Sequence, residues 1–351
     1  MQVLVALSGG VDSSVAAALL VDAGHDVVGV TLRLWGGEGD TGCCAVSDVE
    51  DARRAAAQLG VDHHVFDFGD EFHRDVVGPY VADHAAGRTP NPCIECNRHL
   101  KFAALAERAE VLGFDALATG HHARIVDVAG VGPRIARGAD PAKDQSYVLY
   151  PVRADVLRRV LLPIGHLTKD EVRRIAVERG LRTAAKPDSQ DVCFITRADG
   201  RAAFLRDRVA LHPGRVVDES GTAVGATDAV ELVTVGQRKG LRLAGGTGRR
   251  FVLDVDVPAA TVVVGPPERL LVDDVRLTDV VWADAPVRGP VLAQCSAHGA
   301  ARPGTVTPLG DDGAGSVGAV VTWGAPTRRV APRPSVVLYD GDVVVGGGRV
   351  A

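Results

Sequence analysis

The 351-residue sequence predicts an α/β domain built on a parallel sheet, followed by two regions that are mostly β. In the first half of the chain, short apolar strands alternate with helical patterns. After about residue 200 the helical periodicity fades, and short Val-rich strands separated by Gly, Pro and Asp turns replace it. The Pro266-Pro267 pair suggests one more boundary. We therefore expect an α/β domain over 1–199, a small central β domain over 200–266 and a C-terminal β-barrel-like domain over 267–351.

Each element of the first half has a local signal. Residues 2–7 are a near-continuous apolar strand, and the Ala- and Leu-rich helix that follows runs to about Ala23, where Gly24 is placed to end it. The other predicted elements are the strands DVVGVTLRL, DHHVFDF and DALAT and the helices 47–59, 70–86 and 97–112. Strands that are apolar on both faces and alternate with helices imply a parallel sheet covered by helices on each side.

Composition excludes several classes of protein. A hydrophobic fraction of 46% and a charged fraction of 24% are ordinary for a globular chain and exclude disordered and fibrous proteins. No apolar run approaches the roughly 20 residues that span a bilayer, and the N-terminus lacks the basic region of a signal peptide. Six cysteines are too few for a disulfide scaffold. We expect a cytoplasmic protein with no membrane partner.

The formal net charge of −5 argues against a protein that coats nucleic acid over its whole surface. A local basic segment remains, because residues 153–186 hold nine Lys and Arg against four Asp and Glu. This segment fits either a salt-bridged, solvated helical region or a surface for the phosphates of a nucleic acid.

The segment Ser8-Gly9-Gly10-Val11-Asp12-Ser13-Ser14 lies between the first strand and the first helix. Backbone N–H groups and the positive end of a helix dipole converge at such a junction, which suits a phosphate group. Asp12 makes little sense as a phosphate ligand but does as a ligand for Mg²⁺. A glycine turn with a helix cap is the simpler alternative. The complete motif at this junction favours the phosphate site, and it differs from the GxxxxGK[ST] loop.

The motif SGGVDSS resembles the signature of the ATP pyrophosphatases with a PP-loop, which have an adenine nucleotide alpha hydrolase-like fold. This resemblance implies that ATP is cleaved between its α and β phosphates and that AMP passes to an oxygen of the substrate. It implies ATP and Mg²⁺ as cofactors but leaves the acceptor open. A small metabolite, as in an amide-forming synthetase, is one alternative. A non-catalytic RNA-binding protein is another, although the intact loop speaks against it.

Three cysteines lie in distinctive segments. Cys93 and Cys96 belong to GRTPNPCIECNRHLKF, and Cys193 belongs to KPDSQDVCFI. Cys96 is followed by Asn97 and Arg98 at the apparent start of a helix, where the dipole and the arginine would lower the pKa of a thiol. No second CxxC or matching His pair completes a zinc site.

The motifs TPNPCxxCNRHLKF, ATGHHAR, KDQSYVLY, CFI and GQRKGL, in this order after SGGVDSS, resemble the tRNA-specific 2-thiouridylases. The family places sulfur on C2 of the wobble uridine, position 34, in tRNAs for Lys, Glu and Gln. The resemblance implies that Cys193 carries a persulfide, that Cys96 completes the transfer, and that a Cys96–Cys193 disulfide is the by-product. It also implies a sulfur-donor protein, such as a cysteine desulfurase or a relay protein. With tRNA as the substrate, the resemblance favours a surface for the tRNA backbone as the role of the basic segment 153–186.

The same resemblance assigns binding residues in this chain. Its ATP site corresponds to Ala6, Leu7, Ser8, Gly9, Gly10, Val11, Asp12, Ser13, Leu32 and Gly120. Its tRNA contacts correspond to the target-base loop Asn91, Pro92 and Cys93, to His121 beside Gly120, and to Lys143, Asp144 and Gln145.

Three positions depart from the family pattern. Cys93 replaces an aspartate after Asn91-Pro92, so Cys93, Cys96 and Cys193 could instead hold a [4Fe–4S] cluster with one open iron as the sulfur carrier. The expected arginine is missing from the strand that contains Ser296 and Ala297. The expected PGQ reads Pro332-Arg333-Pro334. We therefore assign no tRNA contacts in the last domain.

Overall fold

The computed structural model describes residues 1–34, 46–188, 192–195, 200–243, 248–310 and 318–351. Contacts within the chain divide it into two compact units. The first unit comprises Met1–Val76, Pro92–Thr196 and Tyr339–Val345. The second comprises Val77–Asn91, Arg197–Leu338 and Gly346–Ala351.

The first unit contains a five-stranded sheet with the strand order β3-β2-β1-β4-β7, and all of its pairings are parallel. Val3, Leu4 and Val5 on the central strand are fully buried, as expected for a strand covered on both faces. The predicted parallel α/β fold is therefore confirmed. The strands are β1 (Gln2–Ala6), β2 (Asp26–Arg33), β3 (Asp62–Asp67), β4 (Ala116–Thr119) and β7 (Val160–Leu161).

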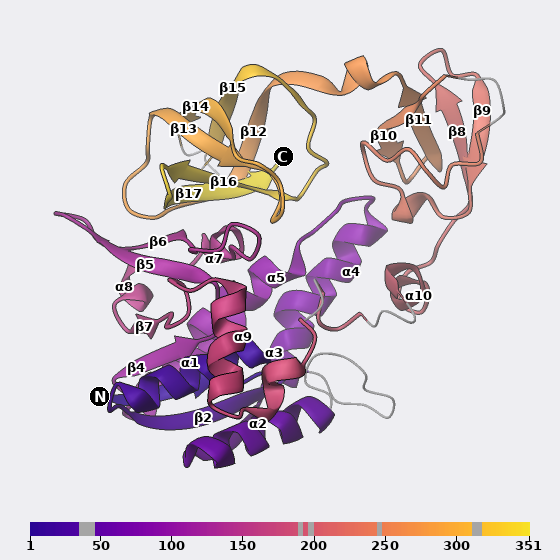
Figure 1. The fold of residues 1–351 in the computed structure, drawn as a ribbon. Coiled ribbons are helices and arrows are strands. Elements are labelled where there is room, and N and C mark those ends of the chain that lie inside the picture. Colours follow the sequence, from indigo (N-terminus) through magenta and orange to yellow (C-terminus); the bar gives the residue numbers. More distant parts are fainter. Residues whose placement is uncertain (35–45, 189–191, 196–199, 244–247, 311–317) are drawn as a thin grey trace. The chain divides into compact units, whose positions relative to one another are not determined.

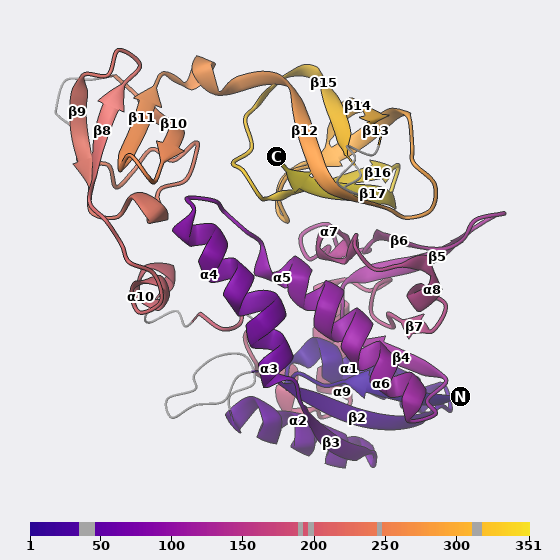
Figure 2. The same ribbon diagram turned by 180° about the vertical axis from the view of Figure 1, so that it is seen from behind.

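Helices cover both faces of this sheet. Figure 1 shows α1 (Val11–Asp22), α2 (Val46–Leu59) and α9 (Lys169–Glu178) in front of it, and Figure 2 shows α6 (Leu105–Val111) in front from the opposite side. Val3 and Val5 pack with Ala17 of α1. The remaining helices are α3 (Gly69–Phe72), η1 (His73–Val77), α4 (Gly78–Ala85), α5 (Pro92–Glu95), η2 (Cys96–Ala104), α7 (Ser146–Leu149), α8 (Ala154–Leu157), η3 (Arg182–Ala185) and α10 (Gly200–Arg206).

Two elements differ from the sequence prediction. The helix expected from Asn97 begins at Pro92, because α5, η2 and α6 follow one another without a break. Proline suits the first position of a helix, where its missing N–H costs nothing, so the Pro-rich turn ends earlier than predicted. A hairpin of β5 (Ala123–Val128) and β6 (Gly132–Arg137) was not predicted.

The first unit also includes residues 339–345. Val343 pairs with Ala136 of β6. Tyr339 is fully buried, its hydroxyl lies 3.1 Å from Ser146 Oγ, and the Arg137 guanidinium lies 3.8 Å from its ring centroid. A segment near the end of the chain is therefore part of the core of the first unit.

The second unit is mostly β, as predicted. One sheet has the order β10-β11-β8-β9 around a core that includes Val216, Val252 and Val264. A second set of six strands closes on itself, because β12 pairs with both β15 and β17. The elements are β8 (Gly214–Asp218), β9 (Ala223–Thr227), η4 (Val230–Leu232), β10 (Phe251–Asp256), β11 (Thr261–Gly265), η5 (Pro267–Leu270), β12 (Leu271–Trp282), β13 (Gly289–Gln294), β14 (Arg302–Pro308), β15 (Ala319–Arg328), β16 (Ser335–Asp340) and β17 (Val343–Val350).

No helix within the described ranges is both long and apolar enough to cross a membrane.

Candidate functional site

The predicted phosphate loop connects β1 to α1. Gly9 has a positive φ of +73°, and a Cβ there would overlap the carbonyl oxygen of Asp48, so this position requires glycine. Ser13 Oγ accepts a hydrogen bond from the Ser8 N–H and donates one to the Gly10 carbonyl, both at 3.2 Å. Gly10 is the N-cap of α1 and has no side chain to occupy the first N–H groups of the helix. Those groups are the donors that an anion would use.

Gly120 follows β4 and lies directly against the loop. A Cβ at Gly120 would come within 2.6 Å of the backbone nitrogen of Ser13 and 2.7 Å of the backbone carbon of Asp12. Leu7 and Leu32 belong to the same region of the sheet, where both side chains are buried. Val11 is also buried, and Ala6 is the last residue of β1. The structure thus brings together the residues predicted for the ATP site, although their role in binding remains a prediction.

Asp12, the second residue of α1, is held by two side chains. Lys169 Nζ lies 2.7 and 2.8 Å from its two carboxylate oxygens, and His122 Nε2 lies 3.1 Å from Oδ1. Burial raises the pKa of Asp12, but the hydrogen bonds from His122 and Lys169 outweigh this effect, so the pKa is lowered. The carboxylate is therefore ionised and already faces a cation, and its chemistry fits a Mg²⁺ ligand.

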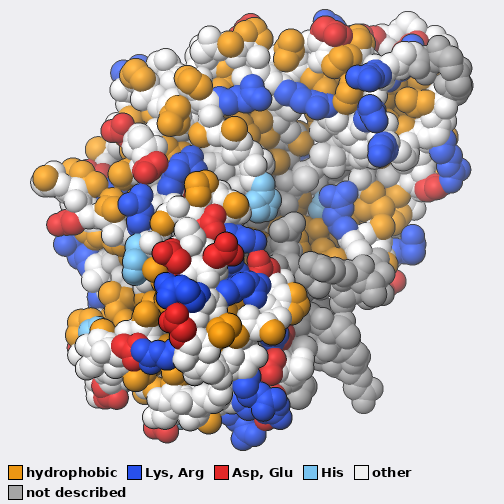
Figure 3. Space-filling model, in the orientation of Figure 1, with side chains coloured by type: hydrophobic (Ala, Val, Ile, Leu, Met, Phe, Trp, Pro, Cys, Tyr) orange, Lys and Arg blue, Asp and Glu red, His pale blue; other side chains and the backbone are white. Residues whose placement is uncertain are grey.

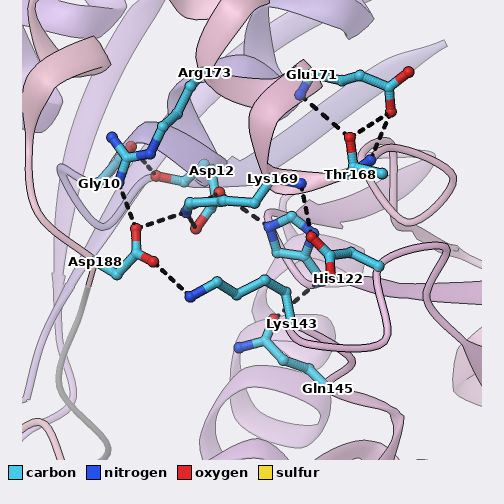
Figure 4. A network of polar contacts seen from close by, with 12 residues as sticks. Gly10, Asp12, His122, Lys143, Gln145, Thr168, Lys169, Glu171, Arg173 and Asp188 are labelled. Atoms are coloured by element: carbon cyan, nitrogen blue, oxygen red, sulfur yellow. Dashed lines mark hydrogen bonds and ion pairs between the residues drawn. The ribbon is translucent and has the colours of Figure 1, made fainter.

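Asp188 is the centre of a second set of ion pairs in the same place (Figure 4). Its carboxylate receives Lys143 Nζ at 2.7 Å, Arg173 Nη2 at 2.6 Å and Lys169 Nζ at 3.1 Å. Burial raises the pKa of Asp188, but the opposing effects of Lys143 and Lys169 are larger together, so the pKa lies well below its usual range. Lys169 therefore joins Asp12 on α1 to Asp188 in the segment that precedes Cys193.

Lys186 attaches the same segment to the loop a second time. Its ammonium donates to the Gly9 carbonyl at 3.0 Å and pairs with Asp48 at 2.6 Å and Asp51 at 2.7 Å. Lys186, Asp188, Lys169 and His122 were not predicted as site residues. The KPD triplet before SQDVC and the His121-His122 pair shortly after a strand were the available signals.

His121 points into the protein core. Its ring is buried, Nδ1 lies 2.7 Å from Thr119 Oγ1, and the Phe102 ring is 5.7 Å away. Complete burial lowers the pKa of His121 well below its ordinary value, so the ring is neutral.

The three cysteines of interest are all in the first unit. Cys96 is buried, whereas Cys93 and Cys193 are partly exposed. Because the helix begins at Pro92, Cys96 lies one turn inside it, and the effect of the helix dipole on its thiol is weaker than the sequence suggested. Phe194, next to Cys193, packs edge-on against Phe72 with ring centroids 5.5 Å apart. Cys43 and Cys44 lie outside the described residues.

A [4Fe–4S] cluster requires its cysteine ligands to lie close together around one point. The described residues include Cys93, Cys96 and Cys193, and among them no group of three or more His, Cys, Asp or Glu side chains could hold a metal ion. The arrangement does not fit a three-thiolate [4Fe–4S] site, and we derive no step through one.

The predicted tRNA contacts have different surroundings. The Lys143 side chain is partly exposed beside Asp188. The Asp144 side chain is buried and accepts hydrogen bonds from Arg137, the Gly138 N–H and Ser146. Gln145 Oε1 accepts from the His122 N–H at 2.9 Å. Pro92 is buried at the start of α5, and Asn91 is half-buried.

The basic segment 153–186 is largely neutralised. Seven of its nine Lys and Arg side chains form ion pairs: Arg153, Arg159, Lys169, Arg173, Arg174, Arg179 and Lys186. Figure 3 shows Lys and Arg side chains beside Asp and Glu over the region of α9, without a continuous basic area. These contacts favour the salt-bridged alternative for this segment over the tRNA-backbone surface that the family resemblance suggests.

In the second unit, Arg333 is one of the residues that departs from the family pattern. It has a positive φ of +80° and pairs with Asp83 at 3.5 Å and Asp279 at 3.7 Å. Its guanidinium thus has partners within its own unit.

A parallel sheet, a glycine loop that opens onto the N-terminus of α1, and Asp12 beside the carboxyl edge of the sheet define an α/β nucleotide-binding protein. A family model described as "tRNA methyl transferase HUP domain" matches residues 1–197, and one described as "tRNA methyl transferase PRC-barrel domain" matches 202–266. The match to the first model covers more than half of the chain.

Curated relatives extend this match to the whole chain. A protein of Beutenbergia cavernae named tRNA-specific 2-thiouridylase MnmA is 49% identical over 100% of this chain and 95% of its own length. A protein of the same name from Mycolicibacterium smegmatis is 47% identical over 100% of this chain and 99% of its own. The chain belongs to the tRNA-specific 2-thiouridylase family.

Among solved structures, a 4-thiouridine synthetase in complex with RNA and bound ATP is 22% identical and covers 55% of this chain and 44% of its own. The TM-score of this comparison is 0.36.

Proposed function

We propose that this chain is an ATP-dependent tRNA-uridine 2-sulfurtransferase. It adenylates the C2 oxygen of wobble uridine 34 with release of pyrophosphate, and then replaces that oxygen with sulfur to give 2-thiouridine and AMP. The observation that carries the proposal is the full-length identity of 49% to a tRNA-specific 2-thiouridylase. The presence of the loop and of Cys93, Cys96 and Cys193 in one compact unit supports it.

The first step uses the loop. Backbone N–H groups at the start of α1 would bind phosphate oxygens of ATP, and Gly9, Gly10 and Gly120 let the backbone approach closely. Mg²⁺, when bound, neutralises phosphate charge, and Asp12 would hold it. The uridine O2 attacks the α-phosphorus, the bond to the β-phosphate oxygen breaks, and pyrophosphate leaves. A poor leaving group on C2 thus becomes AMP.

The second step uses the thiols. The terminal sulfur of a Cys193 persulfide attacks C2 and forms a C–S bond. Cys96, as thiolate, then attacks Cys193 Sγ, and the Sγ–S bond breaks with its electron pair passing to the sulfur on C2. AMP departs with the C2 oxygen, leaving C2=S. The Cys96–Cys193 disulfide that remains must be reduced by a thiol reductant and reloaded by a sulfur-donor protein, such as a cysteine desulfurase or a relay protein.

The tRNAs for Lys, Glu and Gln are the substrates. The residues that correspond to the family's tRNA contacts are Asn91, Pro92, Cys93, His121, Lys143, Asp144 and Gln145. The reaction takes place in the cytoplasm. Residues 1–199 form the catalytic domain, 200–266 a central domain and 267–351 the C-terminal barrel. The family-model matches to 1–197 and 202–266 support the first two boundaries.

The test is thiolation of unmodified tRNA-Lys by the purified chain with Mg-ATP, a cysteine desulfurase with cysteine as the persulfide donor, and a thiol reductant, read by mass spectrometry of the nucleosides. Anaerobic samples are analysed for iron in parallel. We expect 2-thiouridine and AMP without iron. Cys295→Ser is the matched control, since Cys295 is in the other unit and burial raises the pKa of its thiol to about 11. Activity that requires iron would overturn the persulfide route, and ATP turnover with no thiolated product would favour an amide-forming synthetase.

A further inference from the structure

Lys169 is positioned more firmly than a surface lysine. It is the first residue of α9, after the N-cap Thr168, which forms a capping box with Glu171. Its backbone N–H donates to Asp140 Oδ2 at 3.0 Å. The side chain is 9% exposed, and its ammonium lies between the carboxylates of Asp12 and Asp188 (Figure 4). Both the base and the tip of the side chain are thus fixed.

Stability alone does not account for this placement. Removing an ammonium ion from water costs several kcal/mol, and a buried ion pair is often no more stabilising than apolar residues of the same volume. Lys169 also places a positive charge beside the N-terminus of α1, where the helix dipole disfavours a cation. The same dipole favours an anion, so the arrangement makes electrostatic sense once a phosphate group is present.

The charges around Lys169 show what an incoming nucleotide would change. Three cations, Lys143, Lys169 and Arg173, face two carboxylates, Asp12 and Asp188. If Asp12 turns to Mg²⁺, the ammonium of Lys169 loses one of its two partners and is repelled by the metal. Asp188 still holds it from the other side, and a negatively charged phosphate oxygen is the natural replacement partner.

We propose that Lys169 is a phosphate-binding residue of the nucleotide site, whose ammonium exchanges Asp12 for an oxygen of the β- or γ-phosphate when Mg-ATP binds. Asp188 is the positioning residue that keeps the ammonium at the loop during the exchange. This inference deepens the proposed function and depends on it for the identity of the nucleotide.

The experiment compares dissociation constants for Mg-ATP and for AMP, measured by calorimetry on the full chain. AMP lacks the β- and γ-phosphates, so only ATP binding depends on the proposed contact. Lys169→Met should weaken ATP binding by roughly 10- to 100-fold, the value of one charged hydrogen bond or slightly more, and leave AMP binding within about twofold. Lys169→Arg should retain most of the preference for ATP. Arg174→Met is the matched control, since Arg174 is an exposed cation on the same helix.

The outcomes separate the inference from the function on which it depends. Equal losses of ATP and AMP affinity in Lys169→Met, or no loss of either, would overturn the role of Lys169 while wild-type thiolation left the proposed function standing. Failure of the wild-type chain to bind ATP would overturn the proposed function itself. If Lys169→Met does not fold, Lys169→Gln takes its place, because its amide can hydrogen-bond both carboxylates without carrying the charge.

Discussion

Lys186 donates a hydrogen bond to the carbonyl oxygen of Gly9 at 3.0 Å, although 177 positions separate the two residues. The contact joins the KPD segment before Cys193 to the turn of the nucleotide loop. Asp48 and Asp51 of α2 pair with the same ammonium. One side chain therefore connects the loop, a helix and the segment that leads to the thiol.

The Lys186→Met substitution removes all three contacts. It should lower the free energy of unfolding by about 1–3 kcal/mol, because Asp48 and Asp51 then face each other without a cation. Urea unfolding followed by circular dichroism measures the change. Lys239→Met, at an exposed position of the second unit, should leave stability within about 0.5 kcal/mol of wild type. Equal stability of both variants would show that the Lys186 contacts contribute nothing.

The two cysteines should separate the two chemical steps. Cys193→Ser is expected to reduce thiolation by on the order of 10⁴-fold, because the nucleophile is gone, while tRNA-dependent formation of pyrophosphate from ATP continues. Asp12→Asn should abolish both thiolation and pyrophosphate formation. Pyrophosphate release and nucleoside mass spectrometry on the same samples read the two steps. Loss of pyrophosphate release in Cys193→Ser would contradict the role assigned to this thiol.

Asp144 provides a test of a contact suggested by family resemblance. Its carboxylate is buried and binds Arg137 and Ser146 at 2.9 Å each. Removing one partner of a buried pair leaves the other charge uncompensated, so Asp144→Ala should cost about 3–5 kcal/mol of stability. Lys143→Met, at the partly exposed neighbour, should cost less stability and weaken tRNA binding instead. Denaturant unfolding measures the loss of stability in each variant, and filter binding measures the loss of affinity for tRNA. A stable Asp144→Ala protein that has lost tRNA affinity would favour a direct contact with RNA.

His84 should make stability depend on pH. Burial, together with the charge of Arg201, lowers the pKa of His84 to about 4, despite the opposing effect of Asp83. Between its ordinary pKa of 6.5 and about 4, the unfolded chain binds more protons than the folded chain, so the free energy of unfolding falls as the pH falls. The contribution of His84 to the slope approaches about 1.4 kcal/mol per pH unit. Urea titrations from pH 7 to 4.5 should show a smaller slope for His84→Gln, and identical slopes would refute the assignment.

The sequence was most informative where structure follows from local patterns. The strands and helices up to Thr119 could be predicted because apolar periodicity and glycine stops are encoded within each element. The start of the helix predicted at Asn97 was wrong, because a proline such as Pro92 can either belong to a turn or be the first residue of a helix. The contacts of Lys169 with Asp12 and of Lys186 with Asp48 join residues more than 130 positions apart. Local patterns carry no information about such pairs, so these site residues became visible only in the folded chain.

The burial of Tyr339 in the first unit has a consequence for synthesis of the protein. The ribosome completes the sheet and the nucleotide loop early, but the hydroxyl partner of Ser146 and the ring beside Arg137 emerge only after the whole second unit up to Leu338 has been made. At 5–20 residues per second, this interval is on the order of ten seconds. During that time the nascent first unit lacks part of its core, and a prematurely terminated chain would retain the catalytic residues without a complete fold to hold them.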